Sequence, residues 1–366
     1  MKILLTSKLS NSKLEGKLLP LIKSNNIHKI YVVRDFKGPA LPKVAYYEVP
    51  LFFHKPAVLK TIIKLFLLTY LSVSKRADVI YGIHLLYHGI TAFTAAKLTG
   101  KKSMMSIIAG ETETKLHGRI MEKVYLKLLN KFTIITVTGS KTRNYLIKKG
   151  VNPRKVEVIP NAINFKEINP AKKTAKEYDI ITHGRLSKDK NIKTFIRTLA
   201  ILKLKKPSIK AVIVGDGPEK SNLIKLAKKL NLEKNITFTG HQTDVNSFLN
   251  KSKIWVLTSK HEGFPTALIE AMMFGLACVV SDVGDISDFA HNNHNALITS
   301  NCCSADNYAH LISSLIENKR LYSKISKNAQ KIIQEYNLNK VNSEWDKLLK
   351  RIKCEEPKKC AVYAVY

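Results

Sequence analysis

Short runs of apolar and β-branched residues alternate along the chain with longer segments in which apolar positions recur at a helical period. This alternation is typical of α/β folds built on parallel sheets. In the first half, the runs predict strands at 2–6, 29–33, 79–82, 102–108, 133–137 and 156–159. In the second half, they predict strands at 179–182, 210–214, 236–239, 254–257, 277–281 and 296–299, with charged helices between them, such as 191–205 and 219–230.

The pattern breaks in a polar segment at 161–177, which contains Pro170 and shows no apolar period. A length of 366 residues suits two domains of ordinary size. We therefore expect a Rossmann-like N-terminal domain at 1–162, a linker at 163–177 and a C-terminal domain at 178–335. The remaining segment, 336–366, predicts a helix at about 339–353 that packs back toward the N-terminal domain, followed by a tail without a functional pattern.

The most apolar stretch, 57–73, carries Lys60 and Lys64 and is short for a membrane span. It predicts either an ordinary packed helix of the first domain or a helix that lies in a membrane interface, with Lys55, Lys75 and Arg76 nearby. The first seven residues are too short for the apolar part of a secretory signal, and they indicate a buried strand instead.

The chain is strongly basic, with 61 Lys and Arg against 28 Asp and Glu, a formal net charge of +33. Residues 1–160 hold 28 basic and 8 acidic residues, so +20 of this excess lies in the N-terminal part. Such an excess suits polyanionic partners: nucleic acid, an anionic membrane surface or phosphorylated substrates. Only nine of the basic residues are Arg, which argues against specific nucleic-acid recognition. Biased codon usage is an equally good explanation of the lysine content.

The composition excludes collagen-like, disulfide-scaffold and wholly disordered proteins. Five scattered cysteines show no paired spacing, so we expect neither a disulfide framework nor a zinc site, and a reducing cytoplasmic compartment. The strand ends carry no Asp-x-Asp string and the chain has no convincing His/Cys cluster, so we expect no metal and no cofactor.

The densest chemical signal is the segment SKHEGFPTALIEAMMFG at 259–275, which follows a predicted strand. Gly263 permits a tight turn, Pro265 suits the first position of a helix, and Gly275 suits the end of that helix. The loop therefore lies at the carboxyl end of a strand and at the amino end of a helix. Unpaired amides and the helix dipole make that place favourable for a phosphate.

Two carboxylates frame this segment, Glu262 on the loop and Glu270 in the helix. Carboxylates repel phosphate, but each can accept two hydrogen bonds from a pair of hydroxyl groups. A ligand with a diphosphate between two sugar rings satisfies the whole arrangement. The string therefore predicts a nucleotide-sugar site.

Two further strand ends add candidate donor-binding residues. In DIITHGRLSKDKN at 179–191, a strand leads into Gly184, and Arg185 and Lys190 are spaced to hold a diphosphate and to stabilise it as a leaving group. In AVIVGDGP at 211–218, a buried strand ends in a turn at Gly215, a weaker signal because many α/β proteins end strands in this way.

Residues 130–335 resemble the retaining nucleotide-sugar glycosyltransferases of family 4. The matching strings are VTGSKTRNYLIKKGV and VEVIPNAIN within 137–164, HGRLSKDKN at 183–191, VGDGP at 214–218, FTGHQTDVNSFL at 238–249 and SKHEGFPTALIEAMMFGLACVVSDVGD at 259–285. The resemblance implies the GT-B architecture: two Rossmann-like α/β domains that face a central cleft, with the acceptor bound by the first and the donor by the second.

The resemblance also implies residue roles. Glu270 binds the ribose hydroxyls, Glu262 contacts the transferred sugar, and Arg185 and Lys190 hold the diphosphate. Asn161 lies at the hinge between the domains. The other implied donor contacts come from Gly184, Gly215, Gly263, Phe264, Pro265, Thr266 and the base-binding segment 240–244, which includes Gly240 and His241.

On the acceptor side the sequence departs from the family pattern. Many relatives have a glycine pair in the first loop, whereas SKLSNSKLEGK at 7–17 has only Gly16. Many have a histidine after the strand at 102–108, where this chain has Ala109 and Gly110. The nearest substitutes are Glu111, Glu113, His84 and His88, and we take His84 as a candidate catalytic residue and Glu111 as a candidate acceptor-side residue. Asp285 and Asp288 stand where relatives carry a glutamate.

The predicted activity is transfer of a sugar from a nucleoside-diphosphate sugar to a hydroxyl acceptor with retention of configuration and without a metal. The resemblance implies a glycan or lipid-linked acceptor in assembly of a polysaccharide, capsule or lipopolysaccharide. It places the protein in the cytoplasm, where it could be peripheral on the inner face of the plasma membrane. Two alternatives remain, a nucleotide-sugar epimerase of the same fold and a non-catalytic nucleotide-sugar-binding protein.

Overall fold

The computed structural model describes residues 1–50, 57–115, 118–162 and 174–354. The chain divides into two compact units. The first unit comprises Met1–Ile163 and Tyr336–Tyr366, and the second comprises Asn164–Glu335. Most of the expected linker, 163–173, lies outside the described residues, as do Lys55 and the tail from residue 355 onward.

The first unit is built on a seven-stranded sheet in the order β3-β2-β1-β4-β5-β6-β7, in which every neighbouring pair is parallel. The alternation of short apolar runs and helices thus predicted the right class of fold. One strand was missed: β3 lies at the sheet edge, and its residues are half-buried or exposed, so it lacks the apolar run of a buried strand. The strands are β1 (Lys2–Thr6), β2 (Lys29–Arg34), β3 (Val44–Glu48), β4 (Val79–Ile83), β5 (Lys102–Ile107), β6 (Ile134–Val137) and β7 (Val156–Val158).

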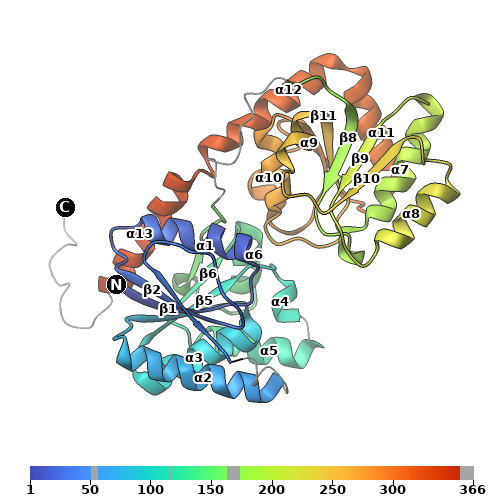
Figure 1. Ribbon diagram of the computed structural model, residues 1–366. Helices are drawn as coiled ribbons and strands as arrows, with labels where there is room; N and C mark the ends of the chain where they lie inside the picture. Colours follow the sequence, from blue (N-terminus) through green and yellow to red (C-terminus); the bar gives the residue numbers. More distant parts are fainter. Residues whose placement is uncertain (51–56, 116–117, 163–173, 355–366) are drawn as a thin grey trace, which may run out of the picture. The chain divides into compact units, whose positions relative to one another are not determined.

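Helices cover both faces of this sheet (Figure 1). On one face, α1 and the C-terminal helix α13 pack over Ile3 and Leu5 of β1, and Trp345 of α13 meets Tyr81 edge-on at 6.2 Å between ring centres. On the other face, α2, α3 and α5 cover the alternate residues of the same strands, such as Leu4 and Met105. The helices are α1 (Asn11–Lys23), α2 (Ala57–Ser74), α3 (Ile90–Thr99), α4 (Thr112–Lys115), α5 (Gly118–Leu129), α6 (Ser140–Lys148) and α13 (Leu338–Cys354), with a π-helical turn at Leu85–Gly89 and a 3₁₀ turn at Pro153–Lys155.

The second unit repeats this plan with a six-stranded parallel sheet in the order β10-β9-β8-β11-β12-β13. The chain leaves its first strand toward one edge and returns to the other side of that strand, so a switch point lies between β8 and β11. In the first unit the corresponding switch point lies between β1 and β4. The strands are β8 (Tyr178–His183), β9 (Ala211–Val214), β10 (Ile236–Gly240), β11 (Ser252–Leu257), β12 (Ala277–Ser281) and β13 (Leu297–Thr299).

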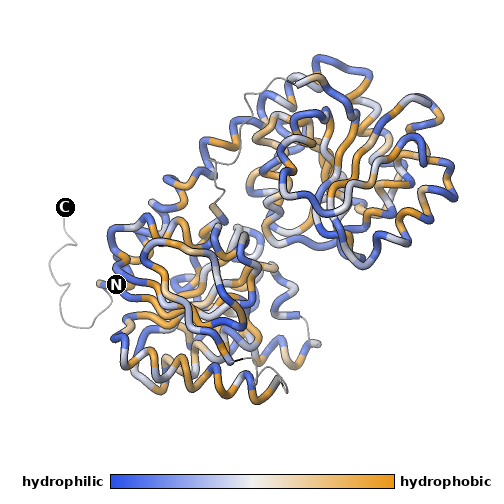
Figure 2. The backbone as a smooth tube through the Cα atoms, in the orientation of Figure 1, coloured by the Kyte–Doolittle hydropathy of each residue, from blue (hydrophilic) through white to orange (hydrophobic). Residues whose placement is uncertain are grey.

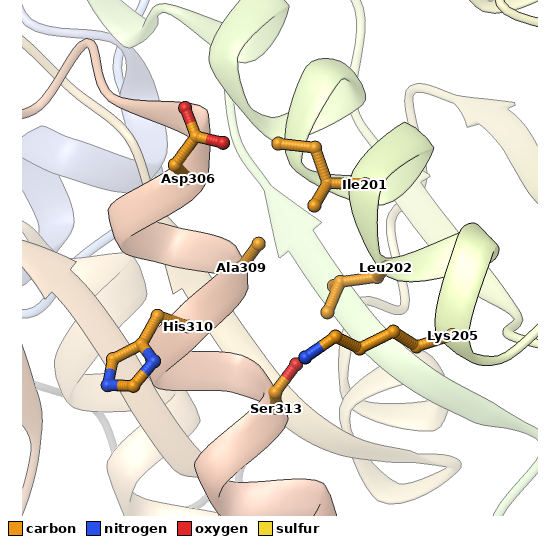
Figure 3. Close-up of a pocket in the computed structure, with 7 residues that line it drawn as sticks. All are labelled: Ile201, Leu202, Lys205, Asp306, Ala309, His310 and Ser313. Atoms are coloured by element: carbon orange, nitrogen blue, oxygen red, sulfur yellow. The ribbon is translucent and has the colours of Figure 1, made fainter.

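The strands of both units are hydrophobic, as is much of α2, and the outer faces of most other helices are polar (Figure 2). In the second unit, α7 and α11 pack side by side, with a small groove of about 170 Å³ between Ile201, Lys205 and His310 (Figure 3). None of the predicted donor-binding residues lines this groove. The helices are α7 (Ile192–Lys205), α8 (Lys220–Lys229), α9 (Asn246–Asn250), α10 (Thr266–Met273), α11 (Ala305–Glu317) and α12 (Lys319–Gln330), with 3₁₀ turns at Lys188–Lys190, Gly284–Asp288 and Lys331–Gln334.

Candidate active site

The predicted donor-binding residues of the second unit gather at the carboxyl ends of its parallel strands. Gly184 and Arg185 follow β8, Gly215 follows β9, and Glu262 lies in the loop after β11. Ligands of open parallel sheets bind outside the carboxyl ends of the strands, at the switch point. The topology therefore places these residues where a ligand is expected.

Three glycines let the loops after β8, β9 and β10 approach one another at backbone distance. A Cβ atom on Gly215 would lie 1.9 Å from the carbonyl oxygen of Gly184, and both residues have a positive φ. The amide of Gly184 donates to the carbonyl of Val214 at 2.9 Å, and that of Gly215 donates to Gly240 at 2.8 Å. A side chain at position 215 would separate these loops, so the glycine is needed for close approach rather than for a plain turn.

Glu270 is held by a chain of hydrogen bonds that begins in the core. The indole Nε1 of Trp255 donates to Nδ1 of His183 at 2.9 Å, and Nε2 of His183 lies 3.1 Å from Oε2 of Glu270. Because an indole can only donate, Nδ1 must accept, and the neutral imidazole therefore carries its proton on Nε2 and donates it to Glu270. The side chains of His183 and Glu270 are 6% and 35% exposed, so the histidine is the support and the carboxylate is the accessible group.

Glu262 and Lys190 lie together as an ion pair, with Nζ of Lys190 2.5 Å from Oε1 of Glu262. The hydroxyl of Ser259 also donates to this oxygen, at 2.7 Å. The Glu262 carbonyl packs on Gly284, where a Cβ atom would lie 2.1 Å away. Lys190, which we expect to bind the diphosphate, is therefore in direct contact with Glu262, which we expect to bind the sugar.

The turn before α10 differs from the predicted one by a residue. Pro265 precedes the helix as its cap, with extended backbone, and Thr266 is the first helical residue. The ring of Phe264 is buried against that of Phe289, with 5.4 Å between the ring centres. This contact anchors the loop between β11 and α10. The amino end of α10 follows Gly263 after two residues, and a phosphate at this helix end stays a prediction.

The remaining donor-side candidates are more exposed. Arg185 and His241 are exposed, and Gly240 is buried beside the Asp216–Lys220 ion pair, whose atoms are 2.7 Å apart. Asp285 is fully buried, its amide donates to the Gly263 carbonyl at 3.1 Å, and Asp288 is half-buried. Asp285 thus stabilises the loop that carries Glu262 and Gly263.

The first-unit candidates lie in a different arrangement from the one expected. Gly16 is inside α1, against the carbonyl of Ala162 at an ordinary contact distance, and not in the loop after β1. Glu111 is half-exposed and forms an ion pair with Lys115. His84 follows β4 at the switch point, where it contacts Glu113 at 3.2 Å. Asn161, near the end of this unit, has a buried side-chain oxygen without a hydrogen bond.

Sequence reasoning missed the support that His183 and Trp255 give to Glu270. His183 is the first residue of the string HGRLSKDKN. The residues next to it in the sequence do not indicate that it supports Glu270, which is 87 positions away. The one available signal was its place as the last residue of a strand at the switch point. Within the described residues, no group of three or more His, Cys, Asp or Glu side chains is arranged to hold a metal ion.

Two sequence models of known families match the chain. Residues 164–332 match the model of glycosyl transferases group 1, and residues 24–167 match that of glycosyltransferase family 4. Together they cover most of both units. The chain belongs to glycosyltransferase family 4.

Curated relatives of this family 4 chain are similar over part of their length. One is the N-acetylgalactosamine-N,N'-diacetylbacillosaminyl-diphospho-undecaprenol 4-alpha-N-acetylgalactosaminyltransferase of Campylobacter jejuni, 29% identical over 51% of this chain and 53% of that protein. Another is the poly(ribitol-phosphate) alpha-N-acetylglucosaminyltransferase of Staphylococcus aureus, 28% identical over 61% of this chain and 45% of that protein. The chain thus spans about half the length of these relatives.

A solved structure shows the same fold over nearly the whole chain. The Anabaena protein HepE, crystallised with UDP, has a TM-score of 0.79 and 18% identity, and the match covers 96% of this chain and 100% of that one. The family 4 chain therefore has the GT-B fold expected from its motifs.

Proposed function

We propose that this family 4 protein transfers a sugar from a nucleoside-diphosphate sugar to a hydroxyl acceptor with retention of configuration. The proposal depends on one observation. Two groups lie at the carboxyl edge of the second sheet, near the start of α10: Glu270, which His183 supports, and the Glu262–Lys190 ion pair. A carboxylate for ribose hydroxyls, a cation for a diphosphate and a carboxylate for a sugar match the three parts of a nucleotide sugar.

The chemistry requires the bond between the anomeric carbon and the diphosphate oxygen to break. The acceptor oxygen bonds to the same face of that carbon, and the acceptor proton passes to the departing diphosphate. Charge builds on the diphosphate as the bond breaks, and Lys190, Arg185 and the α10 amino end are the groups that stabilise it. The ammonium group of Lys190 has three N–H donors. It can therefore keep its ion pair with Glu262 and still donate a hydrogen bond to a phosphate oxygen.

Donor binding is tested by a thermal-shift screen of UDP, GDP and dTDP sugars. A donor present at 100 times its Kd stabilises the second unit by about 2.7 kcal/mol. The best donor is then incubated with and without octyl glycosides, and the products are separated. Transfer supports the proposal, whereas an epimerised donor without acceptor identifies an epimerase. A donor that binds without any product identifies a binding protein.

The acceptor we propose is a glycan or lipid-linked sugar presented at the cytoplasmic face of an anionic membrane, as in polysaccharide or lipopolysaccharide assembly. Both curated relatives described above are named for phosphate-containing acceptors, a diphospho-undecaprenol and a poly(ribitol-phosphate). The +20 charge of residues 1–160 is complementary to such a surface. No nucleic-acid target is part of the proposal.

The outer face of α2 supports this location. Five large apolar side chains, each 57% to 70% exposed, follow one another along the helix, while Leu68 and Leu71 on its other side are buried. The hydrophobic length of α2 stands out in Figure 2. The exposed side chains are Val58, Ile62, Phe66, Tyr70 and Val73.

A second exposed apolar group lies on α5, which covers the same face of the sheet as α2. Ile120, Met121 and Val124 are exposed there, interleaved with exposed Arg119 and Lys123. Apolar side chains among cations are typical of a surface that enters an anionic membrane interface. Among the described residues, no helix is long and apolar enough to cross a bilayer.

The structure corrects one part of the membrane prediction. Lys60 and Lys64 do not flank the apolar face as free cations, because both pair with Asp35, at 3.1 and 2.8 Å. Lys64 is also buried. Of the expected cations that the structure describes, Lys75 and Arg76 do not pair with Asp35, and they follow the end of α2.

Vesicle binding tests the α2 surface. We expect the double substitution Ile62→Gln and Phe66→Gln to weaken binding to phosphatidylglycerol-containing vesicles by about 100-fold, because each side chain contributes roughly 1.5 kcal/mol or more on burial. Leu204→Gln, at an 84% exposed leucine of α7, is the control and should change nothing. Equal loss in both variants, or no binding by the wild type, would contradict the membrane proposal.

A further inference from the structure

Glu113 of the first unit is a buried carboxylate surrounded by hydrogen-bond donors. Its Oε1 accepts from the amides of Ile108 and Ala109, both at 2.8 Å, and its Oε2 accepts from the amide of Leu85 at 3.0 Å. Nδ1 of His84 lies 3.2 Å from Oε1. The side chain is only 5% exposed, so a ligand has little access to the carboxylate itself.

These contacts keep Glu113 ionised. Burial alone would raise the pKa of Glu113, but the hydrogen bonds from His84 and from the two amides after β5 lower it below its ordinary value. Lys17 of α1 adds a positive field, and burial lowers the pKa of this lysine to about 8. A carboxylate in this state can only accept hydrogen bonds.

The state of Glu113 determines which nitrogen of His84 carries the proton. Because the carboxylate only accepts, Nδ1 of His84 must donate, and in the neutral imidazole Nε2 is then an acceptor. Free histidine prefers the opposite tautomer, so the pair imposes an uncommon state. His84 is 21% exposed, which leaves the imidazole accessible to a ligand.

The backbone at His84 is also unusual. Its φ of 72° lies in the left-handed region, which is rare for residues other than glycine, and Tyr87 in the turn that follows also has a positive φ, of 60°. The His84 amide donates to Ser106 of β5 at 3.0 Å, and its carbonyl accepts from Gly89 at 2.8 Å. Such local strain is typical of residues held in place at ligand sites.

His84 also occupies the switch point of its sheet. It follows β4, which pairs with β1, and the loop after β1 begins at Ser7. In the second unit, the residue that supports the donor carboxylate, His183, ends β8 beside the equivalent switch point.

We propose that Glu113 is a positioning residue that holds His84 in its Nδ1-protonated form, so that Nε2 accepts a hydrogen bond from a hydroxyl group of a sugar substrate. The proposal rests on the proposed sugar transfer. The hydroxyl can belong to the acceptor or to the transferred sugar, and two rates distinguish these sources. A contact with the acceptor affects transfer alone, whereas a contact with the donor sugar affects transfer and donor hydrolysis alike.

The first experiment reads the tautomer directly. In ¹⁵N-histidine NMR spectra at mildly alkaline pH, where imidazoles are neutral, we expect His84 of the wild type to show protonated Nδ1 and unprotonated Nε2. His84→Ala assigns the signals. Glu113→Gln should remove this signature, because an amide cannot satisfy all four donors. Protonation on Nε2 in the wild type would overturn the proposal.

The second experiment measures transfer to an octyl glycoside and hydrolysis of the same nucleotide sugar in water. We expect His84→Ala and Glu113→Gln each to lower transfer by about tenfold, the value of one hydrogen bond. His28→Ala and Glu344→Gln are matched controls, because His28 is exposed at the amino end of the sheet and Glu344 lies on the surface of α13.

The outcomes separate the two proposals. Wild-type rates of both reactions in His84→Ala would overturn the role of His84, and circular dichroism of Glu113→Gln shows whether that variant keeps its fold. If the wild type neither transfers nor hydrolyses any nucleotide sugar, the proposed function fails. The tautomer spectrum then still decides whether Glu113 positions His84.

Discussion

The histidine–glutamate pairs of the two units differ in which partner is buried. In the second unit, His183 is 6% exposed and Glu270 is 35% exposed, whereas in the first unit His84 is 21% exposed and Glu113 is 5% exposed. Both pairs stand at the carboxyl edge of a sheet with the same strand order. The buried partner orients the exposed one, so under the proposed function one fold presents a carboxylate to hydroxyl groups in one unit and an imidazole nitrogen in the other.

The largest effect is expected from Glu270→Ala, which removes the exposed partner of the second pair. The affinity for UDP should fall by about 1,000-fold, because two charged hydrogen bonds to the ribose are lost. Isothermal titration calorimetry with UDP and with inorganic pyrophosphate measures this.

The comparison between the two ligands is the control for this variant. Pyrophosphate has no ribose, so its affinity should stay unchanged, and Glu317→Ala on the surface of α11 should leave both affinities unchanged. An equal loss for UDP and pyrophosphate would show that Glu270 does not act on the ribose.

The second prediction concerns Lys17, a buried charge beside Glu113. Its pKa is lowered to about 8, so folding is penalised while Lys17 is protonated. The penalty is complete below the folded pKa, and it disappears as the pH rises toward the unfolded value of 10.5.

Lys17→Met should therefore stabilise the first unit at pH 7 by on the order of 2 to 3 kcal/mol, from the size of the pKa shift. The gain should shrink as the pH rises from about 8 toward 10.5. Urea unfolding at neutral and alkaline pH measures it, and Lys13→Met, at an exposed lysine of the same helix, should stay within about 0.5 kcal/mol of the wild type. A pH-independent gain would mean that the charge of Lys17 is not the cause.

The smallest effect is expected from His183→Phe, which removes the buried partner and keeps the exposed one. UDP affinity should fall by about tenfold, and the protein should lose about 1 to 3 kcal/mol, because the Trp255 indole is left without an acceptor.

Adding Trp255→Phe separates these two effects. The double variant lacks the unpaired indole, so part of the stability should return while UDP affinity stays low. Trp345→Phe, at the equally buried tryptophan of the other unit, is the control for loss of aromatic volume. Recovery of affinity in the double variant would show that His183 does not position Glu270.

Local patterns in the sequence were enough for the buried strands, for the loop that carries Glu262 and for the helix that carries Glu270. Apolar runs predicted the buried strands because strands covered on both faces are apolar along their whole length. The edge strand β3 was not predicted, because its residues are half-buried or exposed and therefore form no continuous apolar run. Pro265 was placed one residue too far into α10, an ordinary uncertainty at helix ends.

The supporting contacts could not be predicted because they join distant positions. Trp255 and His183 are 72 residues apart, and Glu113 is 29 residues from His84. Parallel sheets bring the ends of such segments together only after the fold has formed, so no local pattern records the pairing. For the same reason Lys60 and Lys64 looked like unpaired cations on a surface helix, although both form ion pairs with Asp35, which is 25 and 29 positions away.

The close contact between the backbones of Gly184 and Gly215 limits which residues of this family 4 protein can be substituted. A Cβ atom at position 215 would lie 1.9 Å from the carbonyl oxygen of Gly184, so any other residue there would force these two backbone segments apart. If the segment 240–244 binds the nucleobase, as we propose, the exposed residues His241 and Asp244 are the better positions at which to change it.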